Sequence, residues 1–174
     1  AYIKGKRFLM GQISTVCTKE ILNSGKVWDL LRMAKEYNAL LGINIPAVTG
    51  RWSGNEAVLL NNSEIKVIEE LLKDPCAARD TEGYLTRKCP AGAEEFYLTC
   101  YGDVIPCPFI QISFGNIKRE SIINIWRRMS NFNEFTLMEK SVCLAAENKN
   151  FIRKYLLPLN DFKRAQLPVH VDNY

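Results

Sequence analysis

Residues 88–108 read KCPAGAEEFYLTCYGDVIPCP, and this stretch holds the most informative pattern of the chain. Cys89 is followed by Pro, Ala and Gly, and Cys107 lies between two prolines. Between them apolar and polar residues alternate as in a strand, and the turn pair at 102–103 precedes a second strand-like run. The sequence therefore predicts a β-hairpin over residues 95–107 that brings Cys89 and Cys107 to the same end.

These cysteines have two interpretations. Thiolates on turns are the ligands of iron-sulfur clusters, because short side chains must reach several irons from different directions. Cys143, which lies beyond a helix expected to begin near Ser121, would supply a third ligand. Buried cysteines are also common core residues, however, and the chain has no CxxC pair. From spacing alone both interpretations stay open. The other cysteines are interpreted as structural or incidental thiols: Cys17, Cys76 and Cys100.

The first half of the chain alternates strand-like and helix-like segments. Residues 13–16 are a β-branched run, residues 27–41 have helical spacing, and residues 43–45 read as a second buried strand. After a long loop, Ser63 is expected to cap another helix. This order is typical of parallel α/β units. Two such units cannot close a barrel, so we expect residues 13–45 to join strands from missing sequence or another chain.

Composition excludes several classes of protein. The chain has 174 residues, with 23 Lys and Arg against 19 Asp and Glu and no basic block, which argues against a nucleic-acid surface. No apolar run is long enough for a membrane span, and the first residues lack the order of a secretory signal. We expect a cytoplasmic protein, in which six cysteines are thiols or metal ligands rather than disulfides.

Several motifs occur together in an order that matches a known module. They are Cys89-Pro-Ala-Gly92, Gly102-Asp-Val-Ile-Pro-Cys107, Phe114-Gly-Asn-Ile117, Ser121 and Ile125-Trp126. This order resembles the auxiliary-cluster module called SPASM or twitch, which follows the catalytic barrel in many radical SAM enzymes. Upstream, residues 13–19 and 43–51 resemble the later strands of that barrel.

The resemblance implies a fold class and a domain order. The fold would be α/β: the latter part of a partial (β/α) barrel, followed by a twitch-like module of a β-hairpin and a helix. The barrel part would cover residues 1–74, the auxiliary-cluster module residues 75–150, and a C-terminal tail residues 151–174. The tail beyond Cys143 is expected to wrap over the surface. The missing N-terminal half of the barrel would come from further sequence or from a partner chain.

The resemblance also implies a function. In the family a reduced [4Fe-4S] cluster cleaves S-adenosylmethionine, and the deoxyadenosyl radical abstracts hydrogen from a substrate, here a peptide or a small molecule. An auxiliary [4Fe-4S] cluster on Cys89, Cys107 and Cys143 would bind substrate or carry electrons. Polar residues at strand ends occupy positions that contact S-adenosylmethionine in the family, and Arg suits its carboxylate. These residues are Ser14, Thr15 and Arg51.

The sequence departs from the family pattern in two ways. A full SPASM module uses seven cysteines for two clusters, whereas only three fit here, and Ala146 stands where a partner of Cys143 would be expected. The chain also lacks the CxxxCxxC loop that holds the catalytic cluster. Two other functions therefore stay open: a non-catalytic iron-sulfur module for electron transfer or docking, and a cysteine-rich structural domain without metal.

Overall fold

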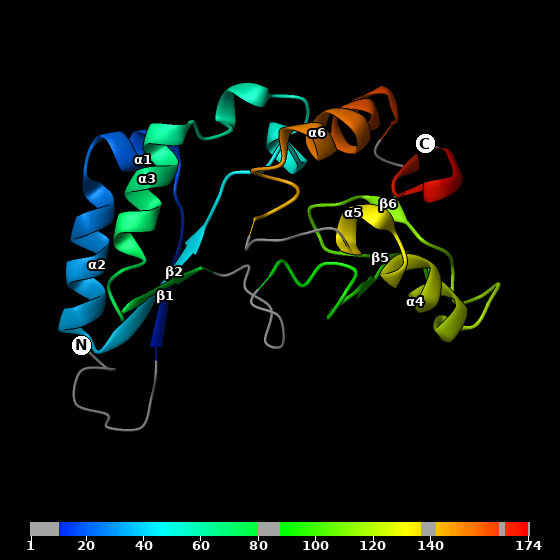
Figure 1. The fold of residues 1–174 in the computed structure, drawn as a ribbon, viewed down its shortest axis with the longest axis horizontal. Coiled ribbons are helices and arrows are strands. Elements are labelled where there is room, and N and C mark those ends of the chain that lie inside the picture. The colour runs from blue at the N-terminus through cyan, green and yellow to red at the C-terminus, as the bar shows by residue number, and fades with distance from the viewer. Residues whose placement is uncertain (1–10, 80–87, 137–141, 164–165, 174) are drawn as a thin grey trace. The chain divides into compact units, whose positions relative to one another are not determined.

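The computed structural model describes residues 11–79, 88–136, 142–163 and 166–173. It mixes helices with small parallel and antiparallel sheets (Figure 1). The chain divides into two compact units, the first formed by Ala1–Pro46 and Val58–Asp80 and the second by Ala47–Ala57 and Thr81–Tyr174. Among the described residues no helix has the length and apolar character needed to cross a membrane.

The first unit is a three-stranded parallel sheet with helices on one side. Its elements are β1 (Gly11–Val16), α1 (Lys19–Asn23), α2 (Lys26–Glu36), β2 (Ala39–Asn44), α3 (Asn62–Leu71) and β3 (Ala77–Arg79). The strand order is β1-β2-β3, and Ile13 pairs with Leu41. Figure 1 shows α2 and α3 on the same side of this sheet. Burial of Leu41, Ile43 and Leu71 there supplies the apolar contact that holds helix to sheet.

The expected parallel strands are present, but two boundaries differ from the predicted ones. The helix predicted over 27–41 ends at Glu36, and Asn38 reverses the chain with a φ of 51°. Residues from Ala39 onward then pair with β1, because a strand there buries Leu41 completely. The third helix is capped by Asn61 rather than Ser63, since the Asn61 side chain accepts the first free N–H groups.

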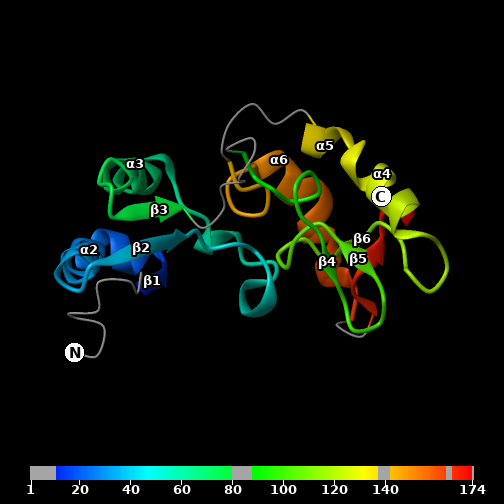
Figure 2. The same ribbon diagram turned by 90° about the horizontal axis from the view of Figure 1, so that it is seen from below.

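The second unit contains short strands and helical segments that surround an aromatic core. Its strands are β4 (Tyr97–Leu98), β5 (Val104–Ile105), β6 (Ile112–Ser113) and β7 (Val169–His170). Its helical segments are η1 (Gly50–Trp52), α4 (Ile122–Ser130), α5 (Asn133–Thr136), α6 (Lys149–Phe151), η3 (Ile152–Leu156), η4 (Leu157–Asp161) and η6 (Val171–Asn173). A further 3-10 turn, η2 (Glu56–Val58), lies at the boundary of the two units. The strands β4 and β5 lie within residues 95–107, where a hairpin was predicted, and they pair in antiparallel fashion (Figure 2).

Polar side chains fix the end of this hairpin. The Asn116 amide donates to Asp103 Oδ1 at 2.9 Å and to the Tyr101 carbonyl at 3.2 Å. Gly102 between them has a φ of 96°, a conformation that favours glycine. An isolated antiparallel bridge also pairs the backbones of Asp103 and Asn116. The predicted cap is confirmed, because the Ser121 side chain accepts the Asn124 N–H at the start of α4.

The core of the second unit is a cluster of rings. Phe114, Phe132 and Phe135 contact one another with centroids 5.1 to 5.7 Å apart, and Phe151 and Tyr155 extend the cluster. Each such aromatic pair contributes roughly 0.5–1.5 kcal/mol beyond area burial. The expectation that the chain beyond Cys143 wraps over the surface is wrong for residues 143–159, because their apolar side chains complete this core.

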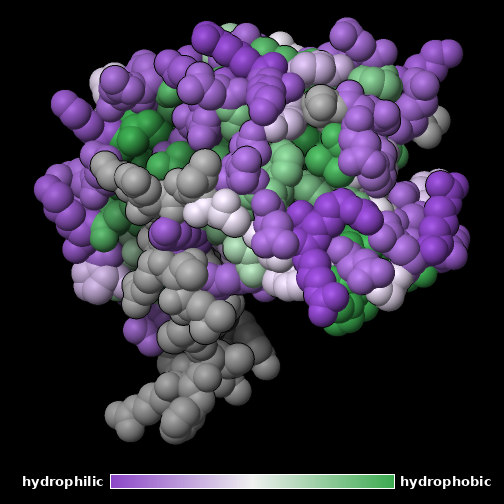
Figure 3. Space-filling model, turned by 45° about the vertical axis from the view of Figure 1, so that its right-hand side comes forward, coloured by the Kyte–Doolittle hydropathy of each residue, from purple (hydrophilic) through white to green (hydrophobic). Residues whose placement is uncertain are grey.

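Apolar side chains also remain at the surface. On the face shown in Figure 3, hydrophilic residues predominate and hydrophobic ones form separate patches. In the second unit the hairpin contributes Leu98 and Tyr101, which are 53% and 70% exposed. Phe96 and Tyr97 of the same segment are also exposed.

Candidate metal centre

Three of the six cysteines lie in loops of the second unit, and all three are buried. Cys89 precedes the hairpin, Cys107 follows β5, and Cys143 begins a tight turn before α6. All six cysteines of the chain are free thiols. The arrangement therefore leaves the three sulfurs available as ligands.

A direct contact links the Cys89 loop to the Cys143 loop. The backbone N–H of Leu144, the residue after Cys143, donates a hydrogen bond to the Cys89 sulfur. Cys107 interacts electrostatically with both other thiols, which raise its pKa. Cys89 likewise raises the pKa of Cys143. The three thiols therefore influence one another electrostatically, and their role as ligands of one cluster stays a prediction.

Burial dominates the acid-base properties of these thiols. It raises the pKa of Cys107 to about 12 and that of Cys143 to about 12, and it also raises the pKa of Cys89. All three thiols are therefore protonated at neutral pH when no metal is bound. Metal ligation by cysteine requires the thiolate, so binding at this site would release protons.

Backbone N–H groups oppose this effect at each sulfur. Ala91 and Leu144 donate to Cys89, Phe109 and Ile110 donate to Cys107, and Ala145 and Ala146 donate to Cys143. Hydrogen bonds to the charged form favour it, so these donors lower the three pKa values. Hydrogen bonds to sulfur are also among the features that tune iron-sulfur clusters. The chemistry of the donor set therefore fits a cluster held by thiolates.

A carboxylate stabilises the Cys143 turn. Glu147 Oε2 accepts the Cys143 N–H at 2.8 Å, and the Glu147 N–H donates to the Cys143 carbonyl at 2.8 Å. The carboxylate also raises the pKa of Cys143 and Cys89 through its negative charge. Glu147 thus fixes the backbone of one predicted ligand, and no spacing rule in the sequence indicated this role.

The Cys89 loop is set by a glycine. Gly92 has a φ of 73°, and its N–H donates to the Glu95 carbonyl at 3.1 Å. A Cβ on Gly92 would lie 2.3 Å from a ring carbon of Phe135. The loop therefore depends on glycine both for its backbone conformation and for its close packing on the aromatic core.

The remaining cysteines lie elsewhere. Cys17 is completely buried in the first unit, where burial raises its pKa to about 11. Cys76 also belongs to the first unit, and its N–H donates to Asp74 Oδ1 at 3.0 Å. Cys100 lies in the hairpin turn and is exposed. The interpretation of these three as structural or incidental thiols stays a prediction.

The residues predicted to contact S-adenosylmethionine fall in different units. Ser14 and Thr15 are in β1 of the first unit, and Arg51 is in η1 of the second. Ser14 is exposed and accepts a hydrogen bond from Gln12 Nε2 at 2.9 Å. Ser14 and Thr15 point to opposite faces of the sheet, because successive side chains alternate along a strand. Their role as cofactor ligands stays a prediction.

Within the described ranges, no group of three or more His, Cys, Asp or Glu side chains is arranged to hold a metal ion. An iron-sulfur cluster needs a different spacing of its ligands from a single metal ion. Each thiolate binds its own iron, so the sulfurs stand farther apart than they do around one ion. The assignment of Cys89, Cys107 and Cys143 as cluster ligands is therefore a proposal that rests on their electrostatic interactions and donors.

Comparison with known proteins bears on the same segment. No curated protein and no solved structure matches the chain. Residues 89–148 match the family model SPASM, described as an iron-sulfur cluster-binding domain. The matched residues begin at Cys89 and include Cys107, Cys143 and Glu147. This segment is therefore similar to the SPASM domain, a domain that binds iron-sulfur clusters.

Proposed function

We propose that this chain is the C-terminal portion of a radical SAM enzyme, with one auxiliary [4Fe-4S] cluster on Cys89, Cys107 and Cys143. The observation that carries the proposal is that three buried thiols within the SPASM match interact electrostatically and each have backbone N–H donors. The bound cluster would supply an electron carrier or an iron open to substrate. The compartment we propose is the cytoplasm, where thiols stay reduced.

The residues of this chain have distinct parts in that function. The three thiolates would hold the cluster, their N–H donors would offset its negative charge, and the apolar surroundings would keep water away. Ser14, Thr15 and Arg51 would contact S-adenosylmethionine in the parent enzyme. The remaining barrel strands would come from sequence outside these residues or from a partner chain.

The test of cluster binding is anaerobic reconstitution of the chain with iron and sulfide. We expect about four irons and four sulfides per chain, visible charge-transfer absorption, and a paramagnetic signal after reduction. The control is a variant with Cys89, Cys107 and Cys143 all changed to alanine. This variant should retain neither iron nor sulfide. A wild-type chain that retains no more iron than this control would disprove the proposal.

One feature of the sequence favours a second candidate function, a non-catalytic iron-sulfur module for electron transfer or docking. The chain has no CxxxCxxC motif, and its six cysteines do not occur at that spacing anywhere. Reductive cleavage of S-adenosylmethionine needs the cluster that this motif holds. The second candidate gains support if the chain binds the cluster but S-adenosylmethionine is not cleaved by any larger protein that contains both the CxxxCxxC motif and this segment.

We expect the isolated chain not to cleave S-adenosylmethionine, even after reconstitution. The physical reason is that the thiols of the second unit can hold a cluster, whereas the motif for the catalytic cluster is absent from the sequence. The measurement is deoxyadenosine formation with dithionite as reductant, followed by chromatography. Turnover above the triple alanine control would show that this short chain is an enzyme by itself.

A further inference from the structure

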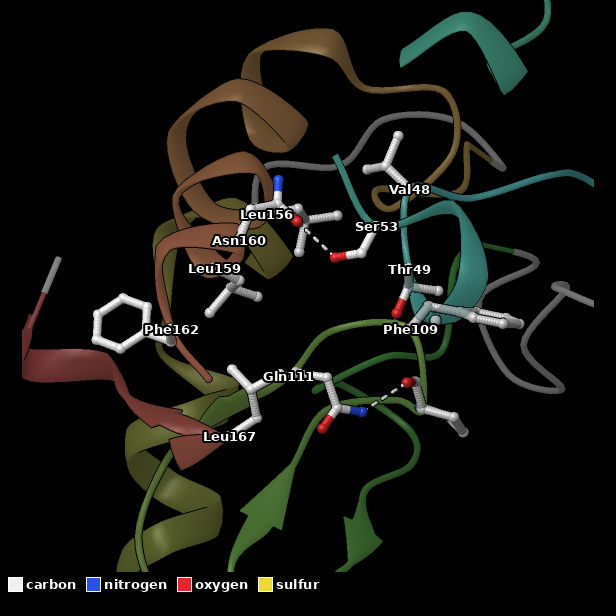
Figure 4. Close-up of a pocket in the computed structure, with 12 residues that line it drawn as sticks. Val48, Thr49, Ser53, Phe109, Gln111, Leu156, Leu159, Asn160, Phe162 and Leu167 are labelled. Atoms are coloured by element: carbon white, nitrogen blue, oxygen red, sulfur yellow. Dashed lines mark hydrogen bonds between the residues drawn. The ribbon is translucent and has the colours of Figure 1, made fainter. Parts of the chain in front are cut away.

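The second unit contains a cavity next to the Cys107 loop. Its volume is about 640 Å³, and it is lined by residues from 48–53, 108–111 and 156–167 (Figure 4). Pockets for small organic ligands commonly fall between roughly 300 and 1,000 Å³. The cavity therefore has the capacity for a ligand rather than for a few waters only.

The walls of the cavity are mostly apolar. Val48, Leu156 and Leu159 are buried side chains that face it, and Phe109, Phe162 and Leu167 complete the apolar lining. No charged side chain is among the described residues that line it. Because a charge taken from water without a partner costs several kcal/mol or more, these walls favour a neutral ligand.

Most polar groups of the lining already have partners. Ser53 Oγ donates to Asn160 Oδ1 at 2.5 Å, and Asn160 Nδ2 donates to the Leu157 carbonyl at 2.9 Å. Gln111 Nε2 donates to the Pro108 carbonyl at 2.8 Å, as Figure 4 shows. The first bond joins the segments 48–53 and 156–167, and the last orients the Gln111 amide.

Two polar side-chain atoms of the described lining have no hydrogen-bond partner. In the described part of the chain neither Gln111 Oε1 nor the Thr49 hydroxyl has a protein partner, and both side chains line the cavity. The Gln111 oxygen can only accept, as any amide oxygen does. The Thr49 hydroxyl can donate to an acceptor on the ligand. A carboxamide, with an N–H donor beside a C=O acceptor, matches this pair of groups.

We propose that this cavity binds a neutral ligand with an apolar body and a carboxamide, recognised by Gln111 Oε1 and the Thr49 hydroxyl. The site also has a link to the thiols, because Phe109 both lines the cavity and donates its N–H to the Cys107 sulfur. The proposal extends the proposed function by giving a ligand class for the region beside the cluster. Binding itself does not require iron.

The test uses three probes that share a phenyl body, with the metal-free chain as the receptor. Hydrocinnamamide carries the carboxamide, hydrocinnamate replaces it with a carboxylate, and N,N-dimethylhydrocinnamamide lacks the N–H donor. Methyl NMR signals of Leu156, Leu159 and Leu167 report on the cavity. We expect saturable shifts with hydrocinnamamide, and affinities at least about tenfold lower for the other two probes.

Matched variants identify the groups that recognise the ligand. Thr49→Val removes the hydroxyl at nearly constant shape, and it should weaken hydrocinnamamide binding by roughly threefold to tenfold. Thr136→Val is the control, because that hydroxyl donates to the Asn133 carbonyl outside the cavity. The methyl spectrum of each variant shows whether it is folded.

Two results would overturn the proposal. One is the absence of shifts at the cavity methyls with hydrocinnamamide, and the other is an equal affinity for hydrocinnamate. Failure of the proposed function is a different result, because the wild-type chain would then not take up iron and sulfide. Ligand binding and cluster binding can thus fail independently.

Discussion

Replacing Cys107 with alanine is expected to lower the iron retained after anaerobic reconstitution by at least about tenfold. Cys107 is buried, interacts electrostatically with the other two thiols and receives two backbone N–H donors, and the variant removes one of the three proposed thiolate ligands. Iron and sulfide analysis after gel filtration measures the effect. Cys89→Ala and Cys143→Ala should show losses of similar size.

The chain offers two matched controls for this experiment. Cys100→Ala removes an exposed thiol from the same hairpin, and Cys17→Ala removes a buried thiol from the first unit. Both variants should retain the iron content of the wild type. If Cys17→Ala lost iron to the same extent as Cys107→Ala, general destabilisation rather than ligation would explain the loss, and the assigned ligands would be wrong.

Gly92→Ala is expected to destabilise the second unit by about 3 kcal/mol. The new Cβ would add two costs, a positive φ for a residue other than glycine and a clash with the Phe135 ring at 2.3 Å. The measurement is urea unfolding followed by tryptophan fluorescence in a Trp28→Phe background. The remaining fluorophores, Trp52 and Trp126, both belong to the second unit.

A second glycine separates these two costs. Gly50 lies in the same unit with a φ of 61°, and a Cβ there would meet no atom within 4 Å. Gly50→Ala should therefore cost only about 1 kcal/mol, the contribution of backbone strain. The double variant Gly92→Ala/Phe135→Leu should lose less unfolding free energy than the two single variants lose together, because the smaller side chain at 135 relieves the clash. Equal destabilisation by both glycine variants would mean that the contact with Phe135 has no role.

Several local features could be predicted from the sequence because they depend on neighbours in the chain. The turn pair Gly102-Asp103 predicted the reversal between β4 and β5, and Ser121 predicted the start of α4. The β-branched run that begins at Ile13 gave β1. In each case the deciding interactions are alternation, turn conformation or capping, which act over a few residues.

Other elements could not be predicted, because pairing over long distances in the chain decides them. Residues 39–41 have the spacing of a helix, yet they join β1 as a strand, since the sheet buries Leu41. Strand β3 consists of Ala77, Ala78 and Arg79, residues with little strand preference, and it forms because β2 offers a free edge.

For the site, the sequence by itself determined which thiols to consider and that Cys89 and Cys107 flank a hairpin. Only the tertiary structure decided that Leu144, in the Cys143 turn, donates to Cys89 and that Glu147 fixes this turn. It also decided that residues near 50, 110 and 160 enclose a cavity beside Cys107. The physical reason is that the burial of these thiols and the Leu144 donor to Cys89 come from segments far apart in the chain, and spacing carries no information about them.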